Sequence, residues 1–358
     1  MVKKRQFERR TVLRTIGTGL GATMLAPSVS AASSDLDGEQ TDADSVTDIE
    51  FEFHGFAFDP SEQSYSPGDE FIFPSIIETS NLSDPLGKYH LYCAPHGTSE
   101  TKDGETVGIA LFYADSLDAD SWTEYAGNPI IDPSDFDASH ISSPHAIYTD
   151  EYDKTLLYWH GSNDTTHWSF CPDGTGVNFD YGGVAVDTSM YDGSSESSYA
   201  RVYEYAIPNR DNSYTMFFMD NQSGTRHIRL ATSHDGKDWT VDSEPVITPQ
   251  SQHDGNVSGP FFFRYDGGYY LAFHASSGNM HVAEVGENLD RADYLGEFTV
   301  PSENDRDDRV STPFLLRDDA GTPYMYYTTG DRLDARIASR RLTDSDDAES
   351  LNLFDPST

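Results

Sequence analysis

The stretch Ser142–Gly161, SSPHAIYTDEYDKTLLYWHG, decides the fold. It has two short runs of apolar and aromatic residues on either side of an acidic turn, a pattern that predicts a β-hairpin. The first run follows Pro144 and begins with His145. The same plan of a proline, an apolar strand, a polar turn and a strand rich in Tyr or Phe returns along the chain.

Five copies of this plan predict five similar sheets. The spacing between successive copies is 53 to 70 residues, which fits a four-stranded antiparallel sheet with its turns. One such sheet cannot bury both of its faces, whereas sheets stacked around an axis can. We therefore predict an all-β fold, a five-bladed β-propeller of four-stranded antiparallel sheets over residues 49–345. The copies begin at Pro74, Pro144, Ala200, Pro260 and Pro313.

A second repeat supports this division. Residues 116–133, SLDADSWTEYAGNPIIDP, resemble residues 233–249, SHDGKDWTVDSEPVITP, and each segment ends 11 residues before the proline of the next copy. Asp side chains cap turns of this kind, and the indoles of Trp122 and Trp239 are expected to cover the outer part of a sheet. We interpret both tryptophans as structural.

The two ends of the chain differ from the repeat region. Residues 1–32 combine a basic start, the pair Arg9-Arg10, a weakly apolar segment and a small-residue pattern, which predict a twin-arginine export signal and an extracellular or cell-surface location. A short membrane anchor is the alternative, but the segment is short and rich in Gly and Thr for a bilayer span. Residues 33–48 are predicted to be a disordered acidic linker, and residues 346–358 a C-terminal tail.

The chain is strongly acidic, with a formal net charge of −38. Removing the five net positive charges of residues 1–32 leaves −43 on the remainder. Such a surface repels nucleic acid and anionic membranes, so we expect a monomer with no nucleic-acid partner and no stable membrane insertion. Carboxylates spread along the whole chain suit molar salt, which screens their repulsion, and they indicate a halophilic archaeon as the source.

The common catalytic and metal-binding motifs are absent from the sequence. Cys93 and Cys171 are the only cysteines; they can form one disulfide but make no zinc pattern. There is no H-E-x-x-H, no G-x-S-x-G and no glycine-rich phosphate loop. The sequence predicts no required cofactor and no catalytic metal, although the propeller axis can hold a structural calcium or sodium ion.

Radial stacking brings one position of each innermost strand to the central channel. We expect these five positions to form a ring at the mouth of the channel and to mark the candidate site. We also expect alanine at either of its two polar members, His145 and Arg201, to abolish ligand binding without unfolding the protein. The ring consists of Ser75, His145, Arg201, Phe261 and Phe314.

The repeat region resembles the glycoside hydrolase superfamily of families 43, 32 and 68. The resemblance lies in the x-P-x-hydrophobic strand openings, the G-x-Y-Y turns and the S-x-D-G-x-x-W segment, and it covers nearly all of residues 50–340. It implies the propeller fold, a glycosidase activity and three carboxylates at the openings of the first three blades. This chain has Ser75, His145 and Arg201 there, so the three-carboxylate mechanism does not carry over.

Other groups must then supply the chemistry. His145 is expected to act as acid or base because its reference pKa lies near neutrality, and Arg201 to bind the carboxylate or sulfate of an anionic sugar. Asp220 and Asp254 are the carboxylates that would complete the catalytic set. Each of these residues has a structural role as its alternative. The remaining substrate-binding candidates are Ser75, Tyr203 for stacking on a sugar ring, Arg309, and the second-strand ends His96, His160 and His274.

The sequence thus predicts an exported, salt-adapted protein that acts on an oligo- or polysaccharide in an axial pocket. Hydrolysis of a glycosidic bond is the leading activity, a non-catalytic carbohydrate-binding propeller is the alternative, and a metal held at the axis is a third. Two carboxylates about 5–9.5 Å apart would favour hydrolysis. A ring of His, Arg and aromatic residues without such a pair would favour binding or other chemistry.

Overall fold

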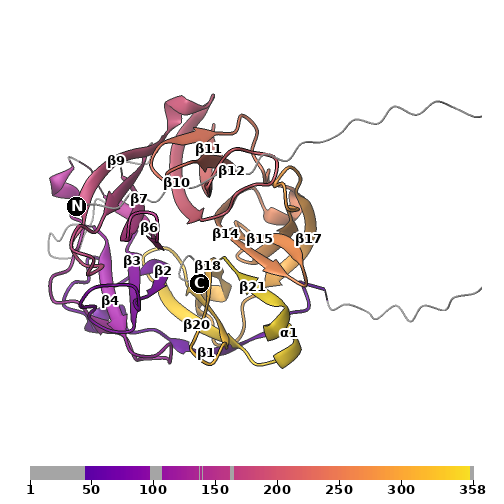
Figure 1. Ribbon diagram of the computed structural model, residues 1–358. Coiled ribbons are helices and arrows are strands. Elements are labelled where there is room, and N and C mark those ends of the chain that lie inside the picture. The colour runs from indigo at the N-terminus through magenta and orange to yellow at the C-terminus, as the bar shows by residue number, and fades with distance from the viewer. Residues whose placement is uncertain (1–44, 97–106, 137, 139, 162–164, 355–358) are drawn as a thin grey trace, which may run out of the picture. The chain divides into compact units, whose positions relative to one another are not determined.

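The computed structural model describes residues 45–96, 107–136, 138, 140–161 and 165–354. The predicted export signal lies outside these residues, as does most of the predicted linker. The described residues belong to one compact unit in which five antiparallel sheets surround a central channel (Figure 1). This arrangement confirms the predicted five-bladed β-propeller.

Each predicted copy contains the innermost strand of one blade. These strands are β2 (Ile72–Glu78), β6 (Ile141–Thr149), β10 (Ser194–Tyr203), β14 (Val257–Tyr265) and β18 (Val310–Arg317). They contact one another in order around the channel, and β18 returns to β2. Each is preceded by a short 3-10 turn, namely η1 (Pro60–Glu62), η3 (Pro133–Asp135), η4 (Thr188–Met190), η5 (Ser251–His253) and η6 (Arg306–Asp308).

The other strands follow outward in each blade. The second strands are β3 (Tyr89–Ala94), β7 (Lys154–Gly161), β11 (Tyr214–Gln222), β15 (Gly268–Ala275) and β19 (Pro323–Thr329). The third are β4 (Ala110–Ala114), β8 (Thr165–Phe170), β12 (Thr225–Ser233), β16 (Met280–Glu284) and β20 (Arg336–Leu342). The outermost are β5 (Thr123–Glu124), β9 (Asp180–Asp187), β13 (Trp239–Val241), β17 (Asp293–Thr299) and β1 (Phe51–Phe56).

The first strand of the chain closes the last blade. β1 pairs antiparallel with β20, with Phe51 opposite Leu342, so one sheet combines residues from both ends of the propeller. The buried Val46, within the predicted linker, packs into the same core as Phe51. The hydrogen bonds of this shared sheet close the ring and leave only short strand edges.

Both tryptophans of the second repeat seal neighbouring blades. Trp122 donates from Nε1 to the hydroxyl of Tyr326 in the last blade at 3.2 Å. The ring of Trp239 lies 6.2 Å from that of Tyr158 in the preceding blade. Both indoles are buried, which confirms their predicted structural role. The cysteines Cys93 and Cys171 are also buried, and both are free thiols.

Every innermost strand carries a bulge at the same place. The pairing with the second strand jumps by three residues on the inner strand, for example from Ser142 to His145. The first residue inside each jump has a positive φ, which is costly for any residue except glycine. These residues are Phe73 (62°), Ser143 (51°), Tyr199 (55°), Gly259 (57°) and Thr312 (49°). The bulge divides each inner strand into a part facing the mouth of the channel and a part facing its interior.

The C-terminal segment folds against the far end of the channel. Helix α1 (Ser345–Ser350) leads into β21 (Leu351–Leu353), which pairs with β14 and gives the fourth blade a fifth strand. Phe354 then stacks on Phe262, with ring centroids 4.4 Å apart. The first part of the expected tail is therefore ordered, because its apolar side chains cover the channel. No helix among the described residues is long and apolar enough to cross a bilayer.

Candidate functional site

A polar pocket of about 350 Å³ lies where the innermost strands begin. Every blade contributes to it, so it exists only because the ring is closed. Its charged and ring-bearing polar residues are four histidines, three arginines, one tyrosine and one glutamate. They are His96, His140, His160, His274, Arg226, Arg309, Arg332, Tyr199 and Glu196.

Tyr199 projects into this pocket from the bulge of β10. Its ring lies 5.0 Å from that of Phe73, 5.9 Å from that of His274 and 6.4 Å from that of His160. Its positive φ of 55° belongs to the bulge that all five inner strands share. Burial raises the pKa of the Tyr199 hydroxyl, while the nearby arginine charges act in the opposite direction.

His160 and His274 occupy equivalent positions in the second and fourth blades. His160 pairs with Ser142 and His274 with Ser258, each directly before the bulge of its inner strand. The backbone N–H of Thr312 donates to Nδ1 of His274 at 3.3 Å, which leaves the proton of a neutral ring on Nε2. Burial lowers the pKa of His160 to about 3 and that of His274 well below its usual value. Both rings are therefore neutral at ordinary pH.

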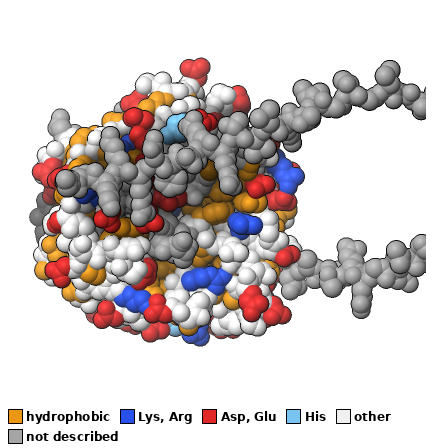
Figure 2. Space-filling view, in the orientation of Figure 1, with side chains coloured by type: hydrophobic (Ala, Val, Ile, Leu, Met, Phe, Trp, Pro, Cys, Tyr) orange, Lys and Arg blue, Asp and Glu red, His pale blue; other side chains and the backbone are white. Residues whose placement is uncertain are grey.

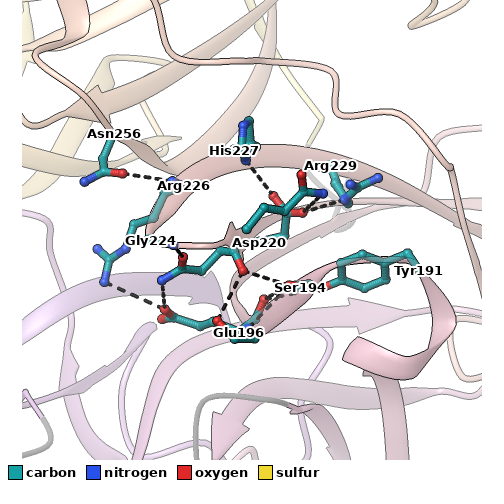
Figure 3. A network of polar contacts seen from close by, with 12 residues as sticks. Tyr191, Ser194, Glu196, Asp220, Gly224, Arg226, His227, Arg229 and Asn256 are labelled. Atoms are coloured by element: carbon teal, nitrogen blue, oxygen red, sulfur yellow. Dashed lines mark hydrogen bonds and ion pairs between the residues drawn. The ribbon is translucent and has the colours of Figure 1, made fainter.

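Three guanidinium groups line the pocket against one carboxylate, Glu196, among the described lining residues. Glu196 lies 3.8 Å from Arg226 (Figure 3). It also accepts a hydrogen bond from Ser198 at 3.1 Å. Arg309 makes no ion pair or side-chain hydrogen bond within the described residues and is half-buried. The pocket thus has a positive excess within a chain of net charge −38. Figure 2 shows that Asp and Glu side chains are instead scattered around the outside of the visible face.

His96 is held at the pocket wall by a buried carboxylate. Its Nδ1 lies 2.7 Å from Glu70, whose other oxygen accepts from the backbone N–H of Leu333 at 2.8 Å. Burial would raise the pKa of Glu70, but the hydrogen bonds and the charge of His96 outweigh it, so the pKa is lowered. Glu70 therefore stays ionised and fixes the His96 ring.

The predicted ring forms, but it lies inside the channel rather than at its mouth. The rings of Phe261 and Phe314 are 5.4 Å apart, and His145 lies 6.2 Å from Phe314. The guanidinium of Arg201 lies over Phe314 and donates to the carbonyls of Pro74 and Pro144. The ring residues follow the bulges, whereas the pocket is built by residues that precede them or lie within them. The correction to the predicted site is therefore a shift of two or three residues toward the start of β2, β6, β10 and β18, while the fourth blade contributes His274 of β15.

Behind the ring lies a small apolar cavity of about 50 Å³, closed by Leu353 and Phe354. His145 and Tyr203 line this cavity and not the polar pocket. Ser75 is fully buried and accepts a hydrogen bond from the backbone N–H of Ala146 at 2.9 Å. His145, Tyr203, Ser75 and Arg201 thus pack the channel, and the structure gives none of them a surface in the pocket.

The two candidate carboxylates lie outside the pocket. Asp220 pairs with Ser197, one residue beyond the position equivalent to His160, which is Met219. Strand alternation turns Asp220 to the other face, where Arg229 donates to it at 2.7 Å (Figure 3). Asp254 is an exposed residue that caps η5 in the left-handed conformation. Neither can join a catalytic set in the pocket as the structure stands.

Four predicted substrate-binding residues do line the pocket: His96, His160, His274 and Arg309. Sequence reasoning missed Tyr199, although it directly precedes the predicted opening at Ala200. It also missed Arg226, near the start of β12, and the turn residue Arg332, for which no repeat signal exists. Among the described residues no group of three His, Cys, Asp or Glu side chains could hold a metal ion. The structural ion at the axis stays a prediction, and Arg201 already supplies positive charge to two axial carbonyls.

Comparison with known proteins relates the fold to glycoside hydrolases. No protein-family model and no curated protein matches the chain. A thermostable family-43 glycoside hydrolase is similar with a TM-score of 0.56 and 12% identity, over 79% of this chain and 92% of that one. The α-L-arabinofuranosidase PaAbf62A of Podospora anserina, in complex with cellotriose, has a TM-score of 0.60 and 13% identity, over 84% and 98%. The catalytic domain of a GH62 α-L-arabinofuranosidase of Coprinopsis cinerea has a TM-score of 0.58 and 12% identity, over 82% and 97%. At such identities the likeness establishes a glycoside hydrolase-like propeller fold.

Proposed function

We propose that this protein binds an anionic carbohydrate in the polar pocket. The observation that carries the proposal is the excess of three guanidinium groups over one carboxylate in a pocket assembled from all five blades. Guanidinium forks match the two oxygens of a carboxylate or sulfate. The pocket volume falls in the range of about 300–1,000 Å³ that is typical of small-molecule sites.

Arg309 is the strongest single element of this proposal. A half-buried guanidinium without a carboxylate partner among the described residues is costly unless a ligand neutralises it. Phe73 and Tyr199 add aromatic faces on which a sugar ring can pack. The glycoside hydrolase-like fold supports a carbohydrate as the ligand, because the pocket opens on the channel of the same kind of propeller.

Hydrolysis by a pair of carboxylates finds little support in this pocket. Such a mechanism needs two carboxyl groups about 5–9.5 Å apart on either side of the sugar. Glu196 is the single carboxylate among the described lining residues, and Glu70 is engaged behind His96. Binding of an anionic glycan is therefore the better-supported function. Export through the twin-arginine pathway and adaptation to molar salt are part of the same proposal, supported by residues 1–32 and by the acidic composition.

Calorimetric titration in molar KCl tests the proposal. Oligomers of galacturonate are compared with neutral xylo-oligosaccharides of similar length, using the wild type, Arg309→Gln and the control Arg291→Gln on the outer surface. We expect galacturonate to bind, Arg309→Gln to weaken binding about tenfold or more, and Arg291→Gln to leave it unchanged. Equal binding of the neutral oligosaccharides, or equal loss in both variants, would refute a charge-selective pocket.

A further inference from the structure

We propose that the pocket cleaves uronate-containing polysaccharides by β-elimination, with His160 and Tyr199 as the groups that move the protons. This inference rests on the proposed binding of an anionic carbohydrate and goes beyond it by naming the uronate class and the reaction. It starts from a mismatch between fold and site. The fold is that of a glycoside hydrolase, yet the described lining residues provide histidines, a tyrosine and arginines where hydrolysis needs two carboxylates.

The charge of the substrate explains this choice of residues. A uronate carries a carboxylate next to C5, and a pair of ionised carboxylates facing it would repel it. Neutral His and Tyr side chains can exchange protons beside such a substrate without that cost. Arginines facing the uronate group stabilise the extra negative charge that develops on it when C5 loses its proton.

The reaction balances with the groups present. His160 takes the proton from C5, and the electron pair of that bond forms the C4=C5 double bond. The bond between C4 and the glycosidic oxygen breaks, and the leaving oxygen takes the proton of the Tyr199 hydroxyl. Arg226, Arg309 and Arg332 hold the uronate carboxylate while charge builds on it. The products are a chain with a new reducing end and a chain that begins with an unsaturated uronate; no water and no oxidant is consumed.

The positions of the two groups fit these roles. Their rings face each other across the pocket wall at 6.4 Å with an interplanar angle of 23°. The Nδ1 atom of His160 is buried without a hydrogen-bond partner among the described residues, so Nε2 is the nitrogen available to the pocket. The Tyr199 hydroxyl likewise has no hydrogen-bond partner within the described part of the chain. Burial keeps the His160 ring neutral in the free protein. A uronate carboxylate bound beside the ring would favour its protonated form and so assist the transfer of the proton from C5.

The neighbouring groups complete the assignment. His274 accepts a backbone N–H at Nδ1, so its Nε2–H is a donor and suits the carboxylate or the leaving oxygen. Glu196 pairs with Arg226 at 3.8 Å and accepts a hydrogen bond from Ser198, so it is placed to position Arg226. Contacts with Phe73 and with both histidine rings hold the Tyr199 phenol in the pocket.

An ultraviolet assay tests the proposal, because an unsaturated uronate conjugated to its carboxylate absorbs where the intact polymer does not. The full chain is incubated in molar KCl with polygalacturonate, alginate or chondroitin sulfate, and reducing ends are measured in parallel. We expect equal yields of reducing ends and ultraviolet-absorbing ends on at least one polymer. Tyr199→Phe and His160→Gln should each reduce the rate 10²-fold or more while binding persists. The control is Tyr152→Phe, which should keep the wild-type rate because Tyr152 lies in the turn before β7, outside the pocket, where its hydroxyl donates to the carbonyl of Asp235.

The possible results separate this inference from the proposed function. Reducing ends without absorbance would mean hydrolysis and would overturn the elimination. Binding of these polymers without any cleavage would overturn the inference and leave the binding function in place, whereas absence of binding to all three would overturn both. If His160→Gln does not fold, the rate of Tyr199→Phe tests the elimination by itself, because this variant keeps the ring contacts and removes only the hydroxyl. An unchanged rate in Tyr199→Phe would overturn the role of Tyr199.

Discussion

Acid should destabilise this protein in part through His145, and the structure gives the size of the effect. The His145 ring is buried, its Nε2–H donates to the carbonyl of Val202 at 2.9 Å, and its Nδ1 faces the Ser75 hydroxyl at 3.4 Å. Both contacts suit a neutral ring with its proton on Nε2. Burial, together with the charge of Arg201, lowers the pKa of His145 to about 3.

The sign follows from proton linkage. Between the folded pKa of about 3 and the unfolded value of about 6.5, the unfolded chain binds a proton that the folded chain does not. The free energy of unfolding therefore falls as the pH drops through this window. At about pH 5 the loss from His145 alone amounts to roughly 2 kcal/mol, and it is absent at about pH 8.

Denaturant unfolding in molar KCl at about pH 8 and about pH 5 measures this loss. In His145→Gln the side-chain amide can still donate to Val202, but nothing titrates at this position. The stability advantage of the wild type over this variant should shrink by roughly 2 kcal/mol on acidification, while other buried histidines cancel in the comparison. The control Tyr203→Phe removes a neighbouring hydroxyl and should run parallel to the wild type. A wild-type advantage that is the same at both pH values would refute the reasoning.

Two further substitutions test how the channel is built. Arg201→Ala leaves the carbonyls of Pro74 and Pro144 without their donor and opens a cavity. The free energy of unfolding should therefore fall by about 3–5 kcal/mol. An unchanged denaturation midpoint would show that the Arg201 side chain does not stabilise the channel. Gly259→Ala places a Cβ 2.6 Å from Nδ1 of His274 at a φ of +57°. This variant should have a lower melting temperature and weaker glycan binding. A variant equal to the wild type in both measurements would contradict the close packing of Gly259 against His274.

The fold could be predicted from the sequence because each blade repeats one local rule. A strand opening, a polar turn and an aromatic strand recur five times, and radial stacking is the arrangement that buries all five copies. The convergence of Ser75, His145, Arg201, Phe261 and Phe314 followed from that symmetry, and the structure brings them together. The strand β21 was not predicted, because the short LNLF segment becomes a strand only through its pairing with β14 at the apolar end of the channel.

The pocket was misplaced because strand registers depend on single residues. A bulge in each inner strand separates the ring residues, which follow the bulge, from the residues before it at the mouth of the channel. The bulge could not be predicted, because its positive-φ residue is of a different type in each strand. The same sensitivity explains Asp220, which stands one residue past the position equivalent to His160 and so faces Arg229 instead. Arg226 lies at the start of β12 and Arg332 in the turn between β19 and β20, so both sit beside hairpin turns whose direction is set by tertiary packing rather than by the repeat.

The division of charge between surface and pocket connects the proposed salt adaptation with the proposed choice of an anionic ligand. Molar salt screens interactions between exposed charges, so the acidic exterior costs little and gives little long-range steering of a ligand. A positive pocket in such a protein must act at contact distance, through groups shielded from the solvent. His160 and His274 are buried and neutral, so the positive charge of the pocket rests on the guanidinium groups, of which Arg309 is half-buried. Selectivity for an anionic sugar should accordingly survive high salt better than binding to an exposed basic patch would, because partly buried pairs are screened much less than exposed ones.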